Sequence, residues 1–405
     1  MVSGLEGIKI VQTASAMAGP MTARLMADWG ADVIWIENPL RGDIVRGNAA
    51  VRRGGRAIPS DVDYFMQNHN RNKRGITLDL SKERGREILY KLVESADVFL
   101  SNFRTREIEK FKLDYQTLKQ LNPKIIYANI TGYGKNGPDR NLPGFEHTSY
   151  FSRTGLLHTL QTPWSPPPQY TVGSGDYVTG VVLAYGIMAA LFIRERIGIG
   201  QEVDTSLYQA GVFAISGDIC GALITGKDRQ SIERREIANA VHNAYQTKDA
   251  RWVRIGMTQP DPYWPQFCKA IEREDLEHDP RFESFDPRIE NHYALFDILE
   301  EVFMSKTLDE WKVRLNKAGV PWAPIQTLPE VAADPQARAN GFYITYDVPD
   351  YGPIEMVANP VKLSETPEKV RTPTPAFGQH TEEVLLEHGY TWDDIAEFKK
   401  LGVIF

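Results

Sequence analysis

The chain has 405 residues, more than one simple core usually holds and enough for two or three packed units. Its 46 basic and 53 acidic residues give a formal net charge of −7, which argues against a broad surface for nucleic acid or another polyanion. Cys220 and Cys268 are not in a metal or redox spacing and the eight histidines form no ligand cluster, so we expect reduced thiols and no metal site.

The first elements along the chain predict a parallel α/β unit. Residues 7–13 form an apolar run typical of a strand, and Gly19-Pro20 then opens a helix that Gly30 closes. Residues 32–37 are a second short apolar run. Strand, helix and strand with tight connections favour parallel pairing. The N-terminus lacks the pattern of a signal peptide, so we expect a cytoplasmic protein.

This pattern then repeats along the first half of the chain. Further strands are predicted at residues 76–80, 98–100 and 125–130, with helices after Ser81 and at residues 115–121. The first half therefore predicts an open, mostly parallel, Rossmann-like sheet with helices on both faces.

The regular alternation of predicted strands and helices ends after Ser206. We assign residues 1–225 to a large α/β domain, residues 226–319 to a smaller α+β domain, and residues 320–405 to a C-terminal return to the large domain. Capping boxes at Thr327–Glu330 and Thr391–Asp394 predict helix starts in this last part.

Generic catalytic signatures are missing from the sequence. It contains no Gly-x-Ser-x-Gly elbow, no His-Glu-x-x-His pair and no Walker loop. Glu37 ends the second predicted strand, as in nicotinamide-binding proteins, but the preceding loop of residues 13–19 has only Gly19 where that fingerprint needs several glycines. The sequence therefore disfavours a dinucleotide site.

Asp176 is the most informative candidate for chemistry. It lies in Gly173-Ser-Gly-Asp-Tyr-Val-Thr-Gly180, at the predicted N-terminus of an apolar helix that is short for a membrane span and contains Gly186. One interpretation is an ordinary helix N-cap. The other is a nucleophile kept ionised by helix-terminal amides, with glycines that admit a bulky ligand and supply amides for an oxyanion.

Ordered motifs along the chain add a resemblance. They are residues 5–11, 19–20, 30–37, 70–80, 101–104, 131–138, 198–207 and 319–324. In this order they resemble the class III CoA-transferases, a family that includes formyl-CoA transferase and carnitine CoA-transferase.

The resemblance implies specific site residues. Asp176 corresponds to the catalytic aspartate of that family. CoA contacts are implied at Met17, Ala18, Asn70, Arg71, Asn72, Lys73, Asn102, Phe103, Arg104, Lys110, Pro143, Gly144, Phe145 and Glu146. The positive charges of Lys73, Arg74, Arg104 and Lys110 suit the CoA phosphates, although solvated surface charge is the alternative for each.

The implied activity is CoA transfer from an acyl-CoA donor such as succinyl-CoA to a carboxylic acid, through an aspartyl anhydride and an aspartyl-CoA thioester. Residues 130–146 are similar to those of transferases for aryl or branched acids, such as phenyllactate and benzylsuccinate. Two alternatives stay open: an α-methylacyl-CoA racemase, and a non-catalytic CoA-binding subunit. CoA enters as a substrate, and no metal, nucleic acid or membrane is implied.

The resemblance also implies an interlocked dimer, formed with a second copy or with a similar chain. The sequence departs from the family at three places. Asn38 stands where an arginine often serves the nucleotide, which leaves Arg41 or another group to substitute. Residues 226–319 lack the Gly-rich lid loop of formyl-CoA transferase, and Phe145 stands where the racemases carry a histidine.

Overall fold

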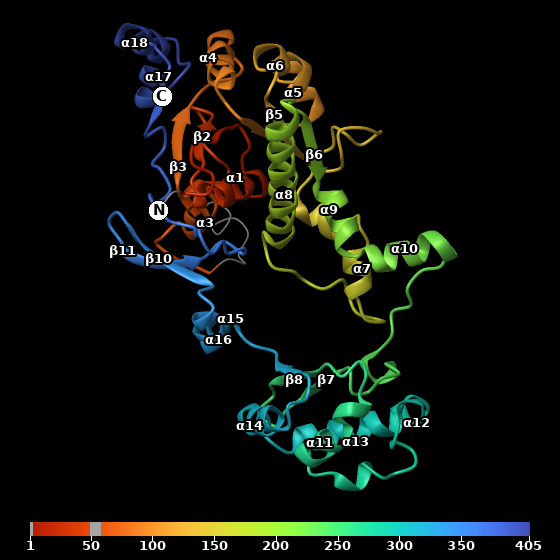
Figure 1. The fold of residues 1–405 in the computed structure, drawn as a ribbon. Helices are drawn as coiled ribbons and strands as arrows, with labels where there is room; N and C mark the ends of the chain where they lie inside the picture. The colour runs from red at the N-terminus through yellow and green to blue at the C-terminus, as the bar shows by residue number, and fades with distance from the viewer. Residues whose placement is uncertain (1–2, 49–57) are drawn as a thin grey trace. The chain divides into compact units, whose positions relative to one another are not determined.

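A computed structural model describes residues 3–48 and 58–405. Its centre is a six-stranded sheet in which every pairing is parallel, with the strand order β3-β2-β1-β4-β5-β6 (Figure 1). The strands are β1 Lys9–Gln12, β2 Asp32–Glu37, β3 Lys73–Thr77, β4 Val98–Ser101, β5 Ile126–Thr131 and β6 Glu202–Ser206. The predicted parallel α/β sheet is confirmed. The order reverses between β1 and β4, and the carboxyl ends of strands at such a point commonly hold a ligand.

Helices cover both faces of this sheet because neighbouring residues of a strand point to opposite sides. Ile10 of β1 packs in a core with helices α1 Ala18–Asp28 and α8 Ser174–Ile197. Val11, the next residue, packs in the other core with α4 Glu83–Glu94, α6 Tyr115–Leu121, α17 Thr381–Glu387 and α18 Trp392–Lys400. The chain's C-terminal helices therefore return to the N-terminal sheet.

The predicted strand at residues 76–80 is displaced from the observed one. β3 pairs with β2 from Lys73 to Thr77 and ends where β2 ends, so residues 78–80 lie beyond the ladder. We expected Ser81 to cap the following helix, but it does not. Its hydroxyl donates to Asp79 at 2.6 Å, and Lys82 is the residue before α4.

The remaining helices of this part are α3 Tyr64–Asn70, α5 Thr105–Phe111, α7 Leu156–Leu160, α9 Leu207–Ala214 and α10 Ser216–Thr225. A hairpin of β10 Tyr343–Val348 and β11 Gly352–Val357 precedes the C-terminal helices. Short turns of 3₁₀ or π-helix occur at Arg46–Asn48 and Glu146–Ser152.

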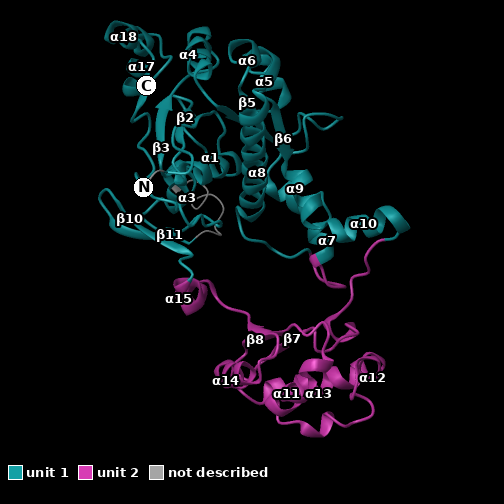
Figure 2. Ribbon diagram, in the orientation of Figure 1, with its two compact units in different colours: residues 1–159, 167–227, 340–405 teal, residues 160–166, 228–339 magenta. Residues whose placement is uncertain are grey.

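The chain divides into two compact units, each built from separate stretches of sequence (Figure 2). Unit 1 contains residues 1–159, 167–227 and 340–405, and unit 2 contains residues 160–166 and 228–339. The sequence interpretation ends the small domain at residue 319. In the structure β9 Trp322–Pro324 pairs with β8 Trp252–Ile255 of the small unit, and the small unit extends to residue 339.

Unit 2 has its own core around a three-stranded antiparallel sheet. Its strands are β7 Ala244–Gln246, β8 Trp252–Ile255 and β9. Its helices are α11 Trp264–Ala270, α12 Phe285–Glu290, α13 His292–Met304, α14 Leu308–Ala318, α15 Leu328–Ala333 and α16 Pro335–Ala339, with 3₁₀ turns at Arg234–Glu236, Asp261–Tyr263 and Glu274–Leu276. Large apolar side chains such as Trp264 and Trp311 fill this core.

The long helix α8 is apolar enough to cross a membrane, and within the described residues the bent pair α9 and α10 is the other such candidate. Leu183, Ile187 and Leu191 of α8 are buried in the core that α8 shares with α1. One face of α8 therefore packs in this core, whereas Tyr185 and Phe192 of the same helix are exposed.

Candidate active site

Asp176 lies in the first turn of α8 and is half-buried. The N-cap residue of the helix is Gly173, whose φ of 88° favours glycine. Glycine has no side chain that could cap the helix. Asp176 is therefore not the N-cap. Its carboxylate is left for another role.

Glu146 binds the amides at the start of α8. Its side chain is buried, and its two oxygens accept the N–H groups of Gly173 at 2.5 Å, Gly175 at 3.0 Å and Asp176 at 3.4 Å. A carboxylate in this position is stabilised by the free amides and the helix dipole. Both carboxylate oxygens of Glu146, a predicted CoA contact, are therefore engaged by the start of the helix.

The same contacts overturn two expectations about the glycines. The amides of Gly173 and Gly175 are not free to bind an oxyanion, because they donate to Glu146. The missing side chain at Gly175 makes room for the ring of Tyr150, since a Cβ there would lie 2.7 Å from it. These glycines serve internal packing rather than the approach of a ligand.

The electrostatics of Asp176 also differ from expectation. Loss of hydration, and then the negative charge of Glu146, raise the pKa of Asp176 to about 8. Helix amides do not keep this carboxyl ionised because Glu146 occupies them. A proton resides on Asp176 at neutral pH and must leave before the group can act as a nucleophile.

Helix α1 packs against the N-terminal half of α8. Thr22 Oγ1 donates to the carbonyl of Gly180 at 3.1 Å, and a Cβ at Gly180 would lie 2.9 Å from the carbonyl oxygen of Ala18. Met17 and Ala18, where α1 begins, therefore lie beside the first turns of α8. The predicted residues Met17, Ala18 and Asp176 share one region.

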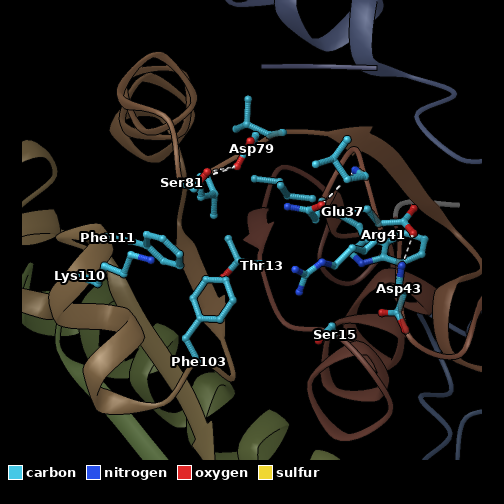
Figure 3. A pocket seen from close by; sticks show the side chains of 17 residues that line it. Thr13, Ser15, Glu37, Arg41, Asp43, Asp79, Ser81, Phe103, Lys110 and Phe111 are labelled. Carbon is cyan, nitrogen blue, oxygen red and sulfur yellow. Dashed lines mark hydrogen bonds between the residues drawn. The ribbon is translucent and has the colours of Figure 1, made fainter. Parts of the chain in front are cut away.

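A cleft of about 450 Å³ opens at the carboxyl ends of β1 to β4, within unit 1. Figure 3 shows Phe103, Phe111 and Lys110 on the side of the cleft opposite Arg41 and Asp43. The two phenylalanine rings meet edge to face with their centres 5.7 Å apart. Arg41 and Lys110 are exposed cations among the lining residues. Aromatic faces beside cations suit a nucleotide with phosphate groups.

Four predicted CoA contacts, Asn70, Arg71, Asn72 and Lys73, have buried side chains that bind other parts of the protein. Arg71 and Asn72 both bind the carboxylate of Asp28 in α1. The Lys73 ammonium donates to the carbonyl of Pro20 and to Asn70 Oδ1, at 2.8 Å each. The Lys73 ammonium is therefore engaged inside the protein, and its predicted contact with CoA phosphates stays a prediction.

The other predicted cations are also engaged within the protein. Arg74 pairs with Asp32, Glu383 and Glu387, near the amino end of β3. Arg104 pairs with Glu107 at 2.7 Å. Of the basic residues predicted for phosphate, Lys110 is the one that lines the cleft.

The remaining predicted residues lie in loops. Asn102 binds the backbone of Ser15 through both ends of its amide, and Phe103 lines the cleft. Pro143 and Phe145 are exposed. Gly144 is pressed against Gly132, where a Cβ would come 2.4 Å from the Gly132 Cα.

Glu37 has no free carboxylate for a ribose. It is nearly fully buried, accepts the N–H of Asp43 at 3.0 Å and pairs with Arg46 at 2.6 Å. This disfavours a dinucleotide site further. Sequence reasoning missed Asp43, Phe111 and Ser81 in the cleft. Asp43 lies in the loop after β2, the strand next to β1, and a position at the carboxyl edge of the sheet is a usable signal.

The family model described as CoA-transferase family III matches residues 5–381 of this chain. The chain belongs to CoA-transferase family III. This confirms the resemblance seen in the sequence, and the protein is an enzyme that transfers CoA.

Two relatives named as CoA-transferases align with this family III chain over almost its whole length. The (R)-2-hydroxy-4-methylpentanoate CoA-transferase of Clostridioides difficile is 34% identical, over 99% of each chain. The cinnamoyl-CoA:phenyllactate CoA-transferase of Clostridium sporogenes is 34% identical, over 98% of this chain and 96% of the relative. The crystal structure of a CAIB/BAIF family protein from Brucella suis has a TM-score of 0.83 and 30% identity, over 96% of this chain and 100% of that chain.

Proposed function

We propose that this family III enzyme moves CoA from an acyl-CoA donor, such as succinyl-CoA, to a carboxylic acid through covalent intermediates on Asp176. The observation that carries the proposal is Asp176 itself, half-buried in the first turn of α8 and free of any capping role. A cleft of about 450 Å³ in the same unit, lined by Phe103, Phe111 and the exposed cations Arg41 and Lys110, supports the CoA part of the proposal.

In the first half-reaction, the Asp176 carboxylate attacks the thioester carbonyl of the donor. A C–O bond forms and the C–S bond breaks, which gives a mixed anhydride and CoA thiolate. The thiolate then attacks the aspartyl carbonyl, releases the donor as a free carboxylate and leaves an aspartyl-CoA thioester. Holding the thiolate close makes this return step effectively unimolecular.

In the second half-reaction, the acceptor carboxylate attacks the aspartyl thioester and CoA thiolate leaves again. The thiolate attacks the acceptor carbonyl of the new anhydride, which yields the product thioester and restores the Asp176 carboxylate. One thioester replaces another, so no ATP is needed. The half-buried position of Asp176 limits the access of water to each anhydride.

Glu146 prepares the nucleophile in this scheme. It fixes the first turn of α8 through the amides of Gly173, Gly175 and Asp176. Its charge also raises the pKa of Asp176, and a carboxylate of higher pKa is a stronger nucleophile once ionised.

For the acceptor, we propose a 2-hydroxy acid with a branched or aryl side chain. Two relatives at 34% identity carry names for acids of this chemistry, 2-hydroxy-4-methylpentanoate and phenyllactate. The exposed Phe145 ring beside Glu146 is suited to contact an apolar side chain.

Matched acceptor pairs test both parts of the proposal. Succinyl-CoA is incubated with phenyllactate or 3-phenylpropanoate, and with 2-hydroxy-4-methylpentanoate or 4-methylpentanoate, and new thioesters are measured by mass spectrometry. We expect new thioesters, formed faster from the hydroxylated member of each pair. Equal rates would refute the 2-hydroxy assignment, and the absence of a thioester from every acid and donor tried would refute acyl transfer to acids.

The assembly we propose is a cytoplasmic, interlocked dimer of two copies. No residue of α10 is buried, and its Leu223 and Ile224 are 80% and 84% exposed. Phe213 of α9 is 74% exposed and Tyr185 of α8 76%. An apolar surface of this kind favours a partner protein. Sedimentation at nanomolar concentration should give a dimer, whereas a folded monomer would contradict the interlocked arrangement.

A further inference from the structure

The loop between β1 and α1, residues 13–17, forms part of the wall of the cleft in unit 1. Thr13 and Ser15 line the cleft, on the side from which α1 departs. Ala16 follows with a φ of 65°, a left-handed conformation that is strained for any residue with a Cβ. Such strain persists only where surrounding contacts hold it.

Several anchors hold this loop. The N–H of Thr13 donates to the carbonyl of Leu100 at 2.8 Å. Asn102 Oδ1 accepts the N–H of Ser15 at 3.1 Å, and Asn102 Nδ2 donates to the Ser15 carbonyl at 2.8 Å. These contacts fix the residues before Ala16.

Asp43 supplies the anchor at the strained residue itself. Its two carboxylate oxygens accept the Ala16 N–H at 3.3 and 3.1 Å, and Oδ1 also accepts the N–H of Val45 at 3.0 Å. Asp43 is 5% exposed and its own N–H donates to Glu37, so the loop after β2 presents this carboxylate in one orientation. Asp43 therefore joins the two loops that flank the cleft.

We propose that Asp43 is a positioning residue for CoA binding: it holds residues 13–17 in the strained conformation that shapes the cleft wall. The inference rests on the proposed use of this cleft for the nucleotide of CoA. Asp43 acts through the backbone of Ala16 and is not itself a phosphate ligand, because a carboxylate repels an anion.

The surroundings of Asp43 make this anchor sensitive to pH. Burial, and to a lesser degree the neighbouring Glu37, raise the pKa of Asp43 to about 6. Its hydrogen bonds to two backbone amides and the charge of Lys73 lower this pKa and offset part of the rise. Arg46 faces the same group through its pairing with Glu37. Below about pH 6 the Asp43 carboxyl gains a proton and loses acceptor capacity for Ala16.

A double-mutant cycle on CoA affinity tests the inference. Asp43→Ala should weaken binding of CoA, measured by calorimetry, by about tenfold, because the left-handed conformation of Ala16 is then unsupported. Ala16→Gly alone should change affinity less than threefold. In the Asp43→Ala background, Ala16→Gly should restore most of the lost affinity, because glycine adopts a positive φ without strain. A merely structural role would not produce this rescue.

The matched control is Asp114→Ala, which removes a carboxylate that accepts a backbone N–H at the start of α6 and should leave CoA affinity unchanged. Asp43→Asn supplies a second readout if Asp43→Ala does not fold. Binding of dephospho-CoA, which lacks the phosphate that titrates near pH 6, should weaken below about pH 6 for the unaltered enzyme and stay flat for Asp43→Asn.

Unchanged affinity in Asp43→Ala, a failed rescue by Ala16→Gly, or identical pH profiles would each overturn the inference. Failure of the proposed function has a different signature: the unaltered enzyme would then form no new thioester from any acid and donor tried, whatever its affinity for CoA.

Discussion

Replacing Glu146 by glutamine removes the charge beside Asp176 with little change of shape. Two unit charges about 4 Å apart at an effective dielectric constant of about 20 interact by about 4 kcal/mol, and this repulsion falls as the charges separate. The pKa of Asp176 is raised to about 8, first by burial and then by Glu146. Because burial is the larger cause, we expect Glu146→Gln to reverse less than half of this rise, about 1–2 pH units below about 8.

The assay is the pH dependence of kcat/KM for CoA transfer, which reports groups of the free enzyme. The nucleophile must be ionised, so for the unaltered enzyme kcat/KM should rise with pH up to about 8 and then level. In Glu146→Gln the rise should be complete about 1–2 pH units lower, at a lower plateau, because the less basic carboxylate is a weaker nucleophile.

A stability measurement accompanies this profile. Glutamine offers one acceptor oxygen in place of two, so an amide of Gly173 or Gly175 loses its partner, which costs about 1–3 kcal/mol. Glu310→Gln makes the same change in a carboxylate that binds helix-terminal groups, at the capping box of α14 in unit 2; it is the matched control and should leave the pH profile unchanged. The reasoning would be refuted if kcat/KM of the unaltered enzyme already levelled near pH 4, or if the pH at which kcat/KM levels were the same in Glu146→Gln as in the unaltered enzyme.

Three further predictions follow from the site. Lys110→Ala should weaken CoA binding several-fold and flatten its dependence on salt, measured by calorimetry at two ionic strengths, because an exposed cation of the cleft is lost. Asp176→Asn should gain stability relative to the unaltered enzyme between pH 6 and pH 9. The pKa of Asp176 is higher in the folded state than in the unfolded state, so the unaltered enzyme loses about 3 kcal/mol of stability as pH rises from 6 through about 8. Denaturation midpoints that diverge in the opposite sense would contradict the raised pKa. A chiral 2-methylacyl-CoA should exchange no α-proton in D₂O, because Phe145 carries no proton and the ring of His147 packs edge to face on Tyr170; exchange at the rate of turnover would indicate a racemase.

The sheet was predictable because its strands are short apolar runs separated by helices with clear starts and stops. The apolar pattern located β1, β2, β4 and β5, and the motif around Asp176 located α8. The error at β3 has a physical cause: pairing with β2 decides where the strand ends, and Leu78 and Leu80 are apolar because they enter the core beyond the ladder.

The internal partners of the buried basic residues could not be predicted from the sequence pattern. Arg71 and Lys73 look like phosphate ligands in sequence, but their partners Asp28 and Pro20 lie in α1 and meet them only after the sheet forms. The role of Glu146 depends likewise on a contact between a π-helical turn and the start of α8. Local pattern carries no information on such long-range pairs.

Detection of the covalent intermediate tests the central claim most directly. The enzyme is incubated with acyl-CoA and no acceptor, quenched in acid, digested and analysed by mass spectrometry, with a parallel sample reduced by borohydride. We predict that the peptide containing Asp176 gains the mass of a CoA thioester, that reduction converts this residue to an alcohol, and that Asp176→Asn shows neither change. Turnover that continues with no adduct on Asp176, or an adduct on another residue, would contradict the account.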